Sequence, residues 1–426
     1  MGCVIWLIVP KNRCFVISLL IIYGDCFMQK TLVSLFAGCG GLDLGFSFAE
    51  FKLLWANDFC KNAVVTYKKN IGDHIVLGDI TKIPSTEIPD SFDVLVGGFP
   101  CQGFSVANTK RNMQDQRNFL YKELLRVLAD KKPKVFLAEN VKGLLSMEGG
   151  RVFEMILNDF RALGYDVSYR VLKASDFGVP QNRERVIIIG NRIGVENLFP
   201  METHGSVEKC SDEVSGLLPY VSVKDVIGFL AEERIREESF ESSDGQVIYN
   251  HMARTNVADS FWDRKYEVSQ KEICAYLREW KNKAGISSKE IDKRLGYLHT
   301  APHWFRSDTS GSIPRPHDWV ELKKILGFDD TYDERVLTLV EKEIVFEQSL
   351  RVSNWDTPSD TITASSPEIH PNKQRRLSAR ECAILQTFPM DFVFEGSLSA
   401  MYRQIGNAVP CKLAYQLGLC IREMLA

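Results

Sequence analysis

The sequence predicts an α/β protein built on a mostly parallel sheet, and three observations support this. Short apolar runs alternate with helix-patterned segments over residues 31–192. Glycine or acidic residues follow the first three runs, where an open sheet forms its ligand crevice. The pattern is lost from about 195 to 355 and then returns, which indicates an insert between two parts of one core.

Seven segments are predicted as strands and four as the helices that connect them. Such alternation is typical of strand–helix–strand units, with helices on both faces of the sheet. The strands are expected at 32–36, 52–56, 75–77, 92–96, 135–138, 167–171 and 186–189, and the helices at 43–50, 60–69, 119–131 and 151–163. One helix is expected in the insert, at 271–284, and two follow it, at 378–386 and 408–424.

Composition narrows the class of protein. A net charge of −3 with 25% charged residues excludes a generally basic chain, so any nucleic-acid surface must be local. The eleven cysteines contain no Cys-x-x-Cys pair, which argues against zinc and for free thiols in a reducing compartment. An apolar run at 14–23 is shorter than the roughly 20 residues that span a bilayer. We expect translation to begin at Met28, with residues 1–27 a dispensable upstream extension.

A glycine-rich segment, residues 34–41, leaves the first strand and enters a helix; we call it the glycine turn. Such turns let main-chain N–H groups approach a ligand at the helix N-terminus. Asp58 follows the second strand and could accept hydrogen bonds from ribose hydroxyls. Asp79 follows the third strand and could accept a hydrogen bond from the exocyclic amine of adenine. Each aspartate alone is more often a turn or cap residue. Together they predict a nucleoside cofactor, either a dinucleotide or S-adenosylmethionine.

The reaction centre is expected around Cys101, which follows Pro100 beyond the end of a buried strand. A thiolate in an exposed loop can act as a nucleophile, although a lone loop cysteine is usually inert. Glu139 ends another buried strand, where burial would favour a protonated, hydrogen-bond-donating carboxyl over a simple cap. The arginines of residues 181–185 precede a strand and could bind a carbonyl or phosphate, or lie in solvent.

These groups suit methylation of a pyrimidine. Attack of the Cys101 sulfur on C6 makes C5 an enamine carbon that accepts a methyl cation. Glu139 would bond N3 and Arg185 would bond O2, and loss of the C5 proton would expel the cysteine. Since C6 is hidden in a stacked duplex, the base must be flipped out.

With these motifs, the chain resembles the DNA (cytosine-5-)-methyltransferases of bacterial restriction–modification systems. The resemblance covers about 31–192 and 350–424 and is carried by residues 36–41, 98–102, 139–141, 181–185, 376–389 and 404–410. It implies a Rossmann-like S-adenosylmethionine-dependent fold, with a seven-stranded, mostly parallel sheet and a smaller irregular target-recognition domain. The implied boundaries are 28–195 for the catalytic and cofactor-binding core, 196–355 for target recognition and 356–426 for the return segment.

The resemblance also implies roles. Cys101 matches the nucleophile, flanked by Pro100 and Gln102, with Glu139, Arg183 and Arg185 around the base. The cofactor positions are Phe36, Ala37, Gly38, Gly40, Gly41, Asp58, Phe59, Asp79, Ile80 and Asn407. S-adenosyl-L-methionine would be the donor and S-adenosyl-L-homocysteine the product, with no metal, double-stranded DNA as substrate and a cytoplasmic, nucleoid-associated location. A restriction endonuclease would share the site without a stable complex.

Three positions depart from the family pattern. Ser34 replaces a usual aspartate, Asp58 a usual glutamate and Phe59 a usual tryptophan. The hydrogen-bonding role at position 34 is therefore open, and weaker cofactor binding is one consequence.

Local cations suggest DNA contacts. Residues 101–126 and 373–380 each carry an excess of lysine and arginine, which DNA phosphates would attract, although solvated segments have the same composition. Arg306 and Arg315 in the insert are our candidates for guanine contacts.

Three other functions stay open. A transfer-RNA substrate would keep the chemistry, a binding-only descendant would occupy DNA without turnover, and a dehydrogenase would use the glycine turn alone.

Overall fold

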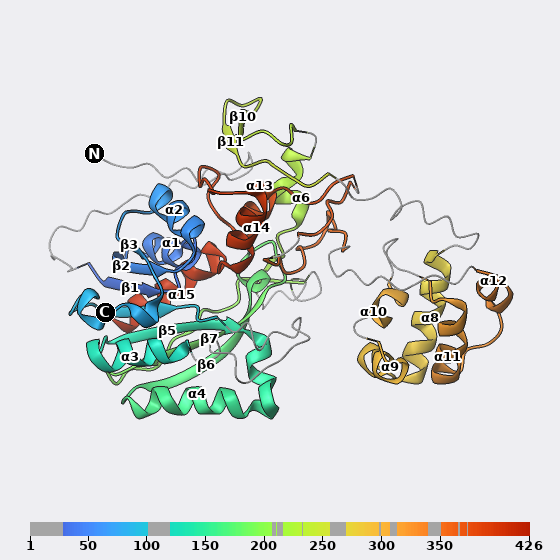
Figure 1. Cartoon of the computed structure of the whole chain (residues 1–426), viewed down its shortest axis with the longest axis horizontal. Helices are drawn as coiled ribbons and strands as arrows, with labels where there is room; N and C mark the ends of the chain where they lie inside the picture. Colours follow the sequence, from blue (N-terminus) through green and yellow to red (C-terminus); the bar gives the residue numbers. More distant parts are fainter. Residues whose placement is uncertain are drawn as a thin grey trace.

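A seven-stranded sheet with the order β3-β2-β1-β4-β5-β7-β6 forms the centre of the fold (Figure 1). The computed structural model describes residues 29–100, 120–206, 210, 216–231, 233–255, 270–297, 300–306, 313–339, 351–364, 367–372 and 374–426. Cys101 and Gln102 lie outside these ranges.

The strands confirm the predicted α/β class. β2, β1, β4 and β5 pair in parallel, as do β2 and β3, whereas β7 is antiparallel to both β5 and β6. All seven predicted strands are present; the one at 75–77 has the predicted ends and the others have shifted ends. Their bounds are β1 (Thr31–Leu35), β2 (Lys52–Asp58), β3 (Ile75–Leu77), β4 (Val94–Gly97), β5 (Val135–Val141), β6 (Asp166–Lys173) and β7 (Glu184–Asn191).

Helices cover both faces of this sheet, which explains why its central strands are apolar without alternation. Leu32 and Val96 face one side, where Phe46 of α1 and Leu417 of α15 pack against the sheet. Residues of the opposite face pack against α3 and α4. We call the sheet with these helices and α2 the sheet unit. The helix bounds are α1 (Gly41–Phe48), α2 (Lys61–Asn70), α3 (Tyr121–Lys131), α4 (Arg151–Ala162) and α15 (Cys411–Met424).

The end of the chain differs from its prediction. The helix expected at 408–424 begins only at Cys411, because Pro410 lies at its N-cap and disfavours a helical conformation of the preceding Val409. An unpredicted helix, α14 (Leu398–Asn407), precedes it, and the Ser397 side chain caps its first turn. α13 (Ala379–Leu385) matches the helix predicted at 378–386. α13 and α14 share a core with α6 (Val223–Ile227) of the insert.

The insert is more regular than the sequence predicted. A hairpin is formed by β10 (Ser239–Glu241) and β11 (Val247–Tyr249), and β8 (His204–Gly205) pairs with β9 (Leu218–Pro219). Residues 270–339, which we call the helical unit, form a group of their own (Figure 1). The buried Ile273, Trp304 and Trp319 belong to its core. It contains α8 (Gln270–Ala284), α9 (Ser288–Leu295), α10 (Ala301–Trp304), α11 (Pro316–Leu326) and α12 (Asp333–Leu337).

Short 3₁₀ segments connect several of the larger elements. They are η1 (Ile80–Lys82), η2 (Ser85–Glu87), η4 (Lys142–Gly150), η5 (Ala174–Phe177) and η6 (Gly228–Leu230). Across the described ranges, no helix is long and apolar enough to span a bilayer.

Candidate active site

The glycine turn is held in a tight, partly left-handed conformation at the carboxyl end of β1. Ala37 N donates to Asn57 O at 2.9 Å, and Gly40 N donates to Ala37 O at 2.9 Å. Gly40 has φ 93°, and a Cβ there would lie 2.2 Å from Ile71 Cδ1, so only glycine fits. Phe36 adopts φ 56°, a conformation that costs about 1–3 kcal/mol for a non-glycine residue and is typical of functional sites.

Asp58, at the end of β2, holds this turn in place through hydrogen bonds. Its Oδ2 accepts from Gly38 N at 2.9 Å, and its Oδ1 accepts from Cys60 N at 2.8 Å. The side chain is buried, and burial raises its pKa. Phe59 beside it is 74% exposed, which leaves its ring free to stack on a ligand.

The third strand end provides a more exposed carboxylate. Asp79 caps η1 and accepts hydrogen bonds from the Thr81 amide and hydroxyl, which lower its pKa. Ile80 is buried in the main core, so its side chain is committed to packing.

The last sequence motif lies against the glycine turn. Cys39 Sγ donates to Gln404 O at 3.6 Å, and Leu42 shares a core cluster with Val409. Gly41 is the first residue of α1, and Asn407 is the exposed last residue of α14. The fold thus brings together two segments that are more than 350 residues apart.

The cradle formed by these strand ends is acidic. Asp43, in the first turn of α1, and Asp58 are both buried, and neither forms an ion pair within the described part of the chain. Two carboxylates without a neighbouring cation favour a positively charged ligand and disfavour a pyrophosphate. The Gly38 amide is already donated to Asp58, so it is not free to bind a phosphate. The cradle therefore fits a sulfonium cofactor better than a dinucleotide.

Glu139 and Arg185 form an ion pair where β5 ends and β7 begins. Arg185 Nε lies 2.7 Å from Glu139 Oε1, and about one tenth of each side chain is exposed. Burial lowers the pKa of Arg185, and the negative charge of Glu139 opposes this shift. The two residues predicted at the target base are therefore adjacent, with Glu139 held by a cation rather than free.

The segment that leads to Cys101 runs along this pair. Asn140 Nδ2 donates to Phe99 O at 3.1 Å. A Cβ at Gly98 would lie 2.9 Å from Glu139 Oε2, so glycine permits close approach of the main chain to the carboxylate. Pro100 is half-buried and is the last described residue before Cys101.

Comparison with known proteins identifies the chain. The family model for C-5 cytosine-specific DNA methylases matches residues 30–423. The type II methyltransferase M.NgoFVII of Neisseria gonorrhoeae is 34% identical over 90% of this chain and 83% of its own length. M.FnuDI of Fusobacterium nucleatum is 31% identical over 92% and 94% of the two chains. The chain belongs to the C-5 cytosine-specific DNA methylase family.

Solved structures agree on the fold of the methylase. A prophage-encoded E. coli protein superposes with a TM-score of 0.57 at 23% identity, covering 93% of this chain and 99% of the other. The Entamoeba histolytica methyltransferase EhMeth gives a TM-score of 0.53 at 15% identity, covering 94% and 99%. The methylase is a DNA (cytosine-5-)-methyltransferase, and its family implies dependence on S-adenosylmethionine.

Arg183 of the methylase is buried and binds main-chain carbonyls, unlike Arg185, which pairs with Glu139. It is 1% exposed and donates from Nη1 to Ile362 O at 3.1 Å and from Nη2 to Gly406 O at 2.9 Å. Gln181 Nε2 donates to Gln386 Oε1 at 3.1 Å. Residues 181–183 thus join the sheet unit to the return segment, a role that sequence reasoning missed because arginines are rarely buried.

The prediction that residues 373–380 offer cations to DNA is wrong for the three arginines of this segment. Arg375, Arg376 and Arg380 are all less than 10% exposed, so they are neither a DNA surface nor a solvated helix start. Arg375 pairs with Glu381 through both terminal nitrogens at 2.6 Å. Lys373 and most of the first cationic segment lie outside the described residues, and Arg126 is bonded to Glu123 and Ser85.

In the insert, Arg315 is engaged within the helical unit. Its Nε lies 2.7 Å from Asp318 Oδ2, and its Nη2 donates to Tyr297 Oη at 2.6 Å. A guanine contact by Arg315 would require these bonds to be exchanged.

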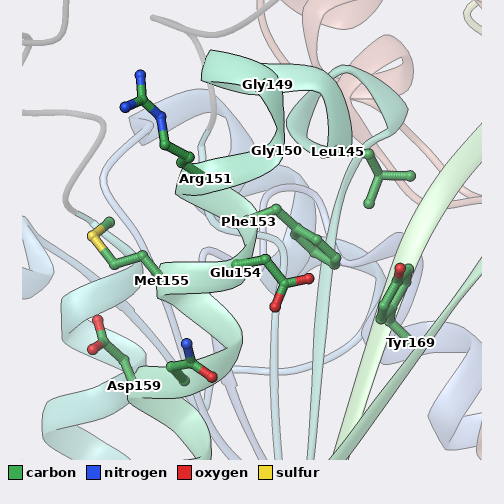
Figure 2. A pocket seen from close by; sticks show the side chains of 10 residues that line it. Leu145, Gly149, Gly150, Arg151, Phe153, Glu154, Met155, Asp159 and Tyr169 are labelled. Atoms are coloured by element: carbon green, nitrogen blue, oxygen red, sulfur yellow. The ribbon is translucent and has the colours of Figure 1, made fainter.

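One hollow of about 720 Å³ lies away from the residues assigned to the reaction. It is lined by η4, α4 and the edge strand β6, with Phe153 packed edge-on against Tyr169 (Figure 2). None of the predicted site residues lines it. Nor do the described residues contain a cluster of histidine, cysteine or acidic side chains that could hold a metal.

Proposed function

We propose that the methylase transfers a methyl group to C5 of a cytosine flipped out of a specific double-stranded DNA sequence, through a covalent bond between Cys101 and C6. We further propose that it protects the site of a bacterial restriction endonuclease, as the names of its type II relatives suggest. Cys101, Pro100 and Gln102 form the nucleophile loop in this proposal.

The Glu139–Arg185 ion pair supports this proposal most directly. The two side chains are partly buried, meet at 2.7 Å and lie beside the main chain that leads to Cys101. A carboxylate and a guanidinium side by side match the N3–C4-amine edge and the O2 of cytosine. Arg183 then acts as a positioning residue, since both its terminal nitrogens bind main-chain carbonyls.

The chemistry requires no redox step. The Cys101 thiolate forms a bond to C6, and the C5–C6 π electrons become available at C5. Arg185 stabilises negative charge on O2, and a proton taken up from solvent is shared between N3 and the Glu139 carboxylate. After methylation, a base removes the C5 proton, the C5–C6 double bond re-forms and the thiolate leaves.

S-adenosylmethionine would supply an activated methyl group on its sulfonium sulfur. Asp58, Asp79 and the exposed Phe59 ring are suited to its nucleoside, and Phe36–Gly41 with Asn407 to the remainder. The buried carboxylates of Asp43 and Asp58 fit its positive charge.

A mechanism-based trap tests the proposal. Duplex DNA that carries 5-fluorocytosine in the recognised sequence should form a denaturation-resistant adduct with the wild-type chain and methyl donor. Because fluorine cannot leave as a proton does, the Cys101–C6 bond persists. We expect no adduct with Cys101→Ser, although DNA binding is retained. The recognised sequence is first found by bisulfite sequencing of a methylation-free host that expresses the chain. Wild-type methylation without an adduct at Cys101 would refute the mechanism, and transfer to transfer RNA in place of DNA would refute the substrate.

A further inference from the structure

We infer that Asp43 is a positioning residue of the methyl-donor site, which fixes the glycine turn through hydrogen bonds from Ser34 and Tyr67. The inference rests on the proposed donor site and assigns it a carboxylate that the sequence motifs did not single out.

The first contact joins the residues on either side of the turn. Ser34, in β1, donates from Oγ to Asp43 Oδ1 at 2.6 Å. Asp43 lies in the first turn of α1, immediately after the turn. The hydrogen bond therefore closes the base of the loop formed by residues 35–42, in the interior where both side chains are at most 1% exposed.

The second contact comes from α2. Tyr67 Oη donates to Asp43 Oδ2 at 2.7 Å and lies 2.9 Å from His74 Nε2. Since the single hydroxyl proton is directed to Asp43, His74 Nε2 must be the donor in the second bond. The ring of Tyr67 also touches the turn, because a Cβ at Gly40 would lie 2.9 Å from its Cδ2.

A carboxylate at this position is unusual for a purely structural role. Asp43 is 0% exposed and makes no ion pair within the described ranges. Burial of an unpaired charge is costly, and the same packing could be achieved with neutral residues. Its charge lies beneath the turn that we assign to a cationic donor, together with that of Asp58. We therefore assign Asp43 to donor binding rather than to folding alone.

The geometry provides a swap test. Ser34 and Asp43 face one another, so exchanging them in Ser34→Asp/Asp43→Ser keeps one hydroxyl, one carboxylate and their hydrogen bond. Asp43→Asn removes the charge, and Ser34→Asp alone places two carboxylates together. Affinity for S-adenosylmethionine is measured by calorimetry, and KM for the donor and kcat are measured with saturating DNA.

We expect Asp43→Asn to weaken donor binding roughly tenfold and to raise the donor KM similarly, with kcat nearly unchanged at saturation. Donor binding should be weaker still in Ser34→Asp, and the donor affinity of the double variant should return to within about threefold of the wild-type value. Unchanged donor affinity in Asp43→Asn, or a double variant no better than Ser34→Asp, would overturn the inference.

Asp93→Asn is the matched control. Asp93 accepts hydrogen bonds from the Thr31 amide and hydroxyl at the opposite end of β1. Its loss should lower the melting temperature without changing donor affinity. If Asp93→Asn weakened donor binding as much as Asp43→Asn, the effect would be general and the inference would fail. Failure of the proposed function is seen separately, as absence of methyl transfer by the wild-type chain.

Discussion

The sheet unit and the helical unit are stabilised by interactions of different range. In the sheet unit, buried polar contacts join distant parts of the chain, as when Arg183 binds Ile362 O and Gly406 O. In the helical unit, ion pairs such as Glu279–Lys283 and Glu290–Arg294 span a single helical turn. Among the described residues, those buried in its core all lie between 273 and 336. We therefore expect the chemistry to depend on these long-range contacts, and the helical unit to tolerate change without disturbing them.

The largest effect that would test this comparison is expected at Trp319. Its ring is 0% exposed and stacks on Tyr276, and its Nε1 donates to Asp333 Oδ1 at 2.8 Å. Trp319→Ala should destabilise the helical unit by about 3–5 kcal/mol. Limited proteolysis should cut this unit first, and DNA binding should weaken, while calorimetry shows unchanged affinity for S-adenosylmethionine.

Val320→Ala provides the control for Trp319, because the neighbouring valine is 42% exposed and should change little. Loss of donor binding in Trp319→Ala would show that the two units are coupled, contrary to the comparison.

A somewhat smaller effect, confined to the sheet unit, is expected at Arg185. Arg185→Ala leaves Glu139 buried without its partner and removes the group assigned to O2. Single-turnover methyl transfer should fall about 10²–10³-fold, which corresponds to about 2.7–4 kcal/mol. Glu184→Gln, which alters the exposed neighbour paired with Lys142, should transfer at nearly the wild-type rate. Equal losses in both variants would argue against a specific role for Arg185.

The smallest effect concerns the segment where the insert meets the return segment. His251 is buried beside Ser378 and close to Glu381, Arg375 and His370, and burial lowers its pKa to about 4. Because the pKa is depressed on folding, neutral His251 supports the fold above about pH 6.5, and this support is lost as the pH falls toward 4. At pH 5.5 the loss is about 1 kcal/mol. Urea unfolding of wild type and His251→Gln at pH 7.5 and 5.5 measures it.

The variant should show the smaller decrease between the two pH values. An identical decrease in both proteins would assign the pH dependence to other groups.

How much could be predicted from the sequence also differs between the two units. The central strands of the sheet unit were predictable because they are buried on both faces and bounded by turn residues, and Glu139 and Arg185 were each singled out by motifs at strand ends. The helices α9, α10 and α12 were missed because they contain only four to eight residues, too few to show a period. The burial of Arg183 and Arg375 depends on partners far along the chain or on the folded core, which local pattern does not reveal. The open role of Ser34 was answered only by its contact with Asp43.

That contact has a thermodynamic consequence. Burial raises the pKa of Asp43 to about 6 from an ordinary value of 3.8, so its ionisation is disfavoured in the native state. The neutral form supports folding at low pH, and this support is lost as the pH rises through 6, by about 3 kcal/mol in total. Near neutral pH the native protein therefore tolerates a charge that opposes its own folding. An amide at this position would be expected to yield a more heat-resistant protein that binds its methyl donor less tightly, a conflict between durability and donor affinity.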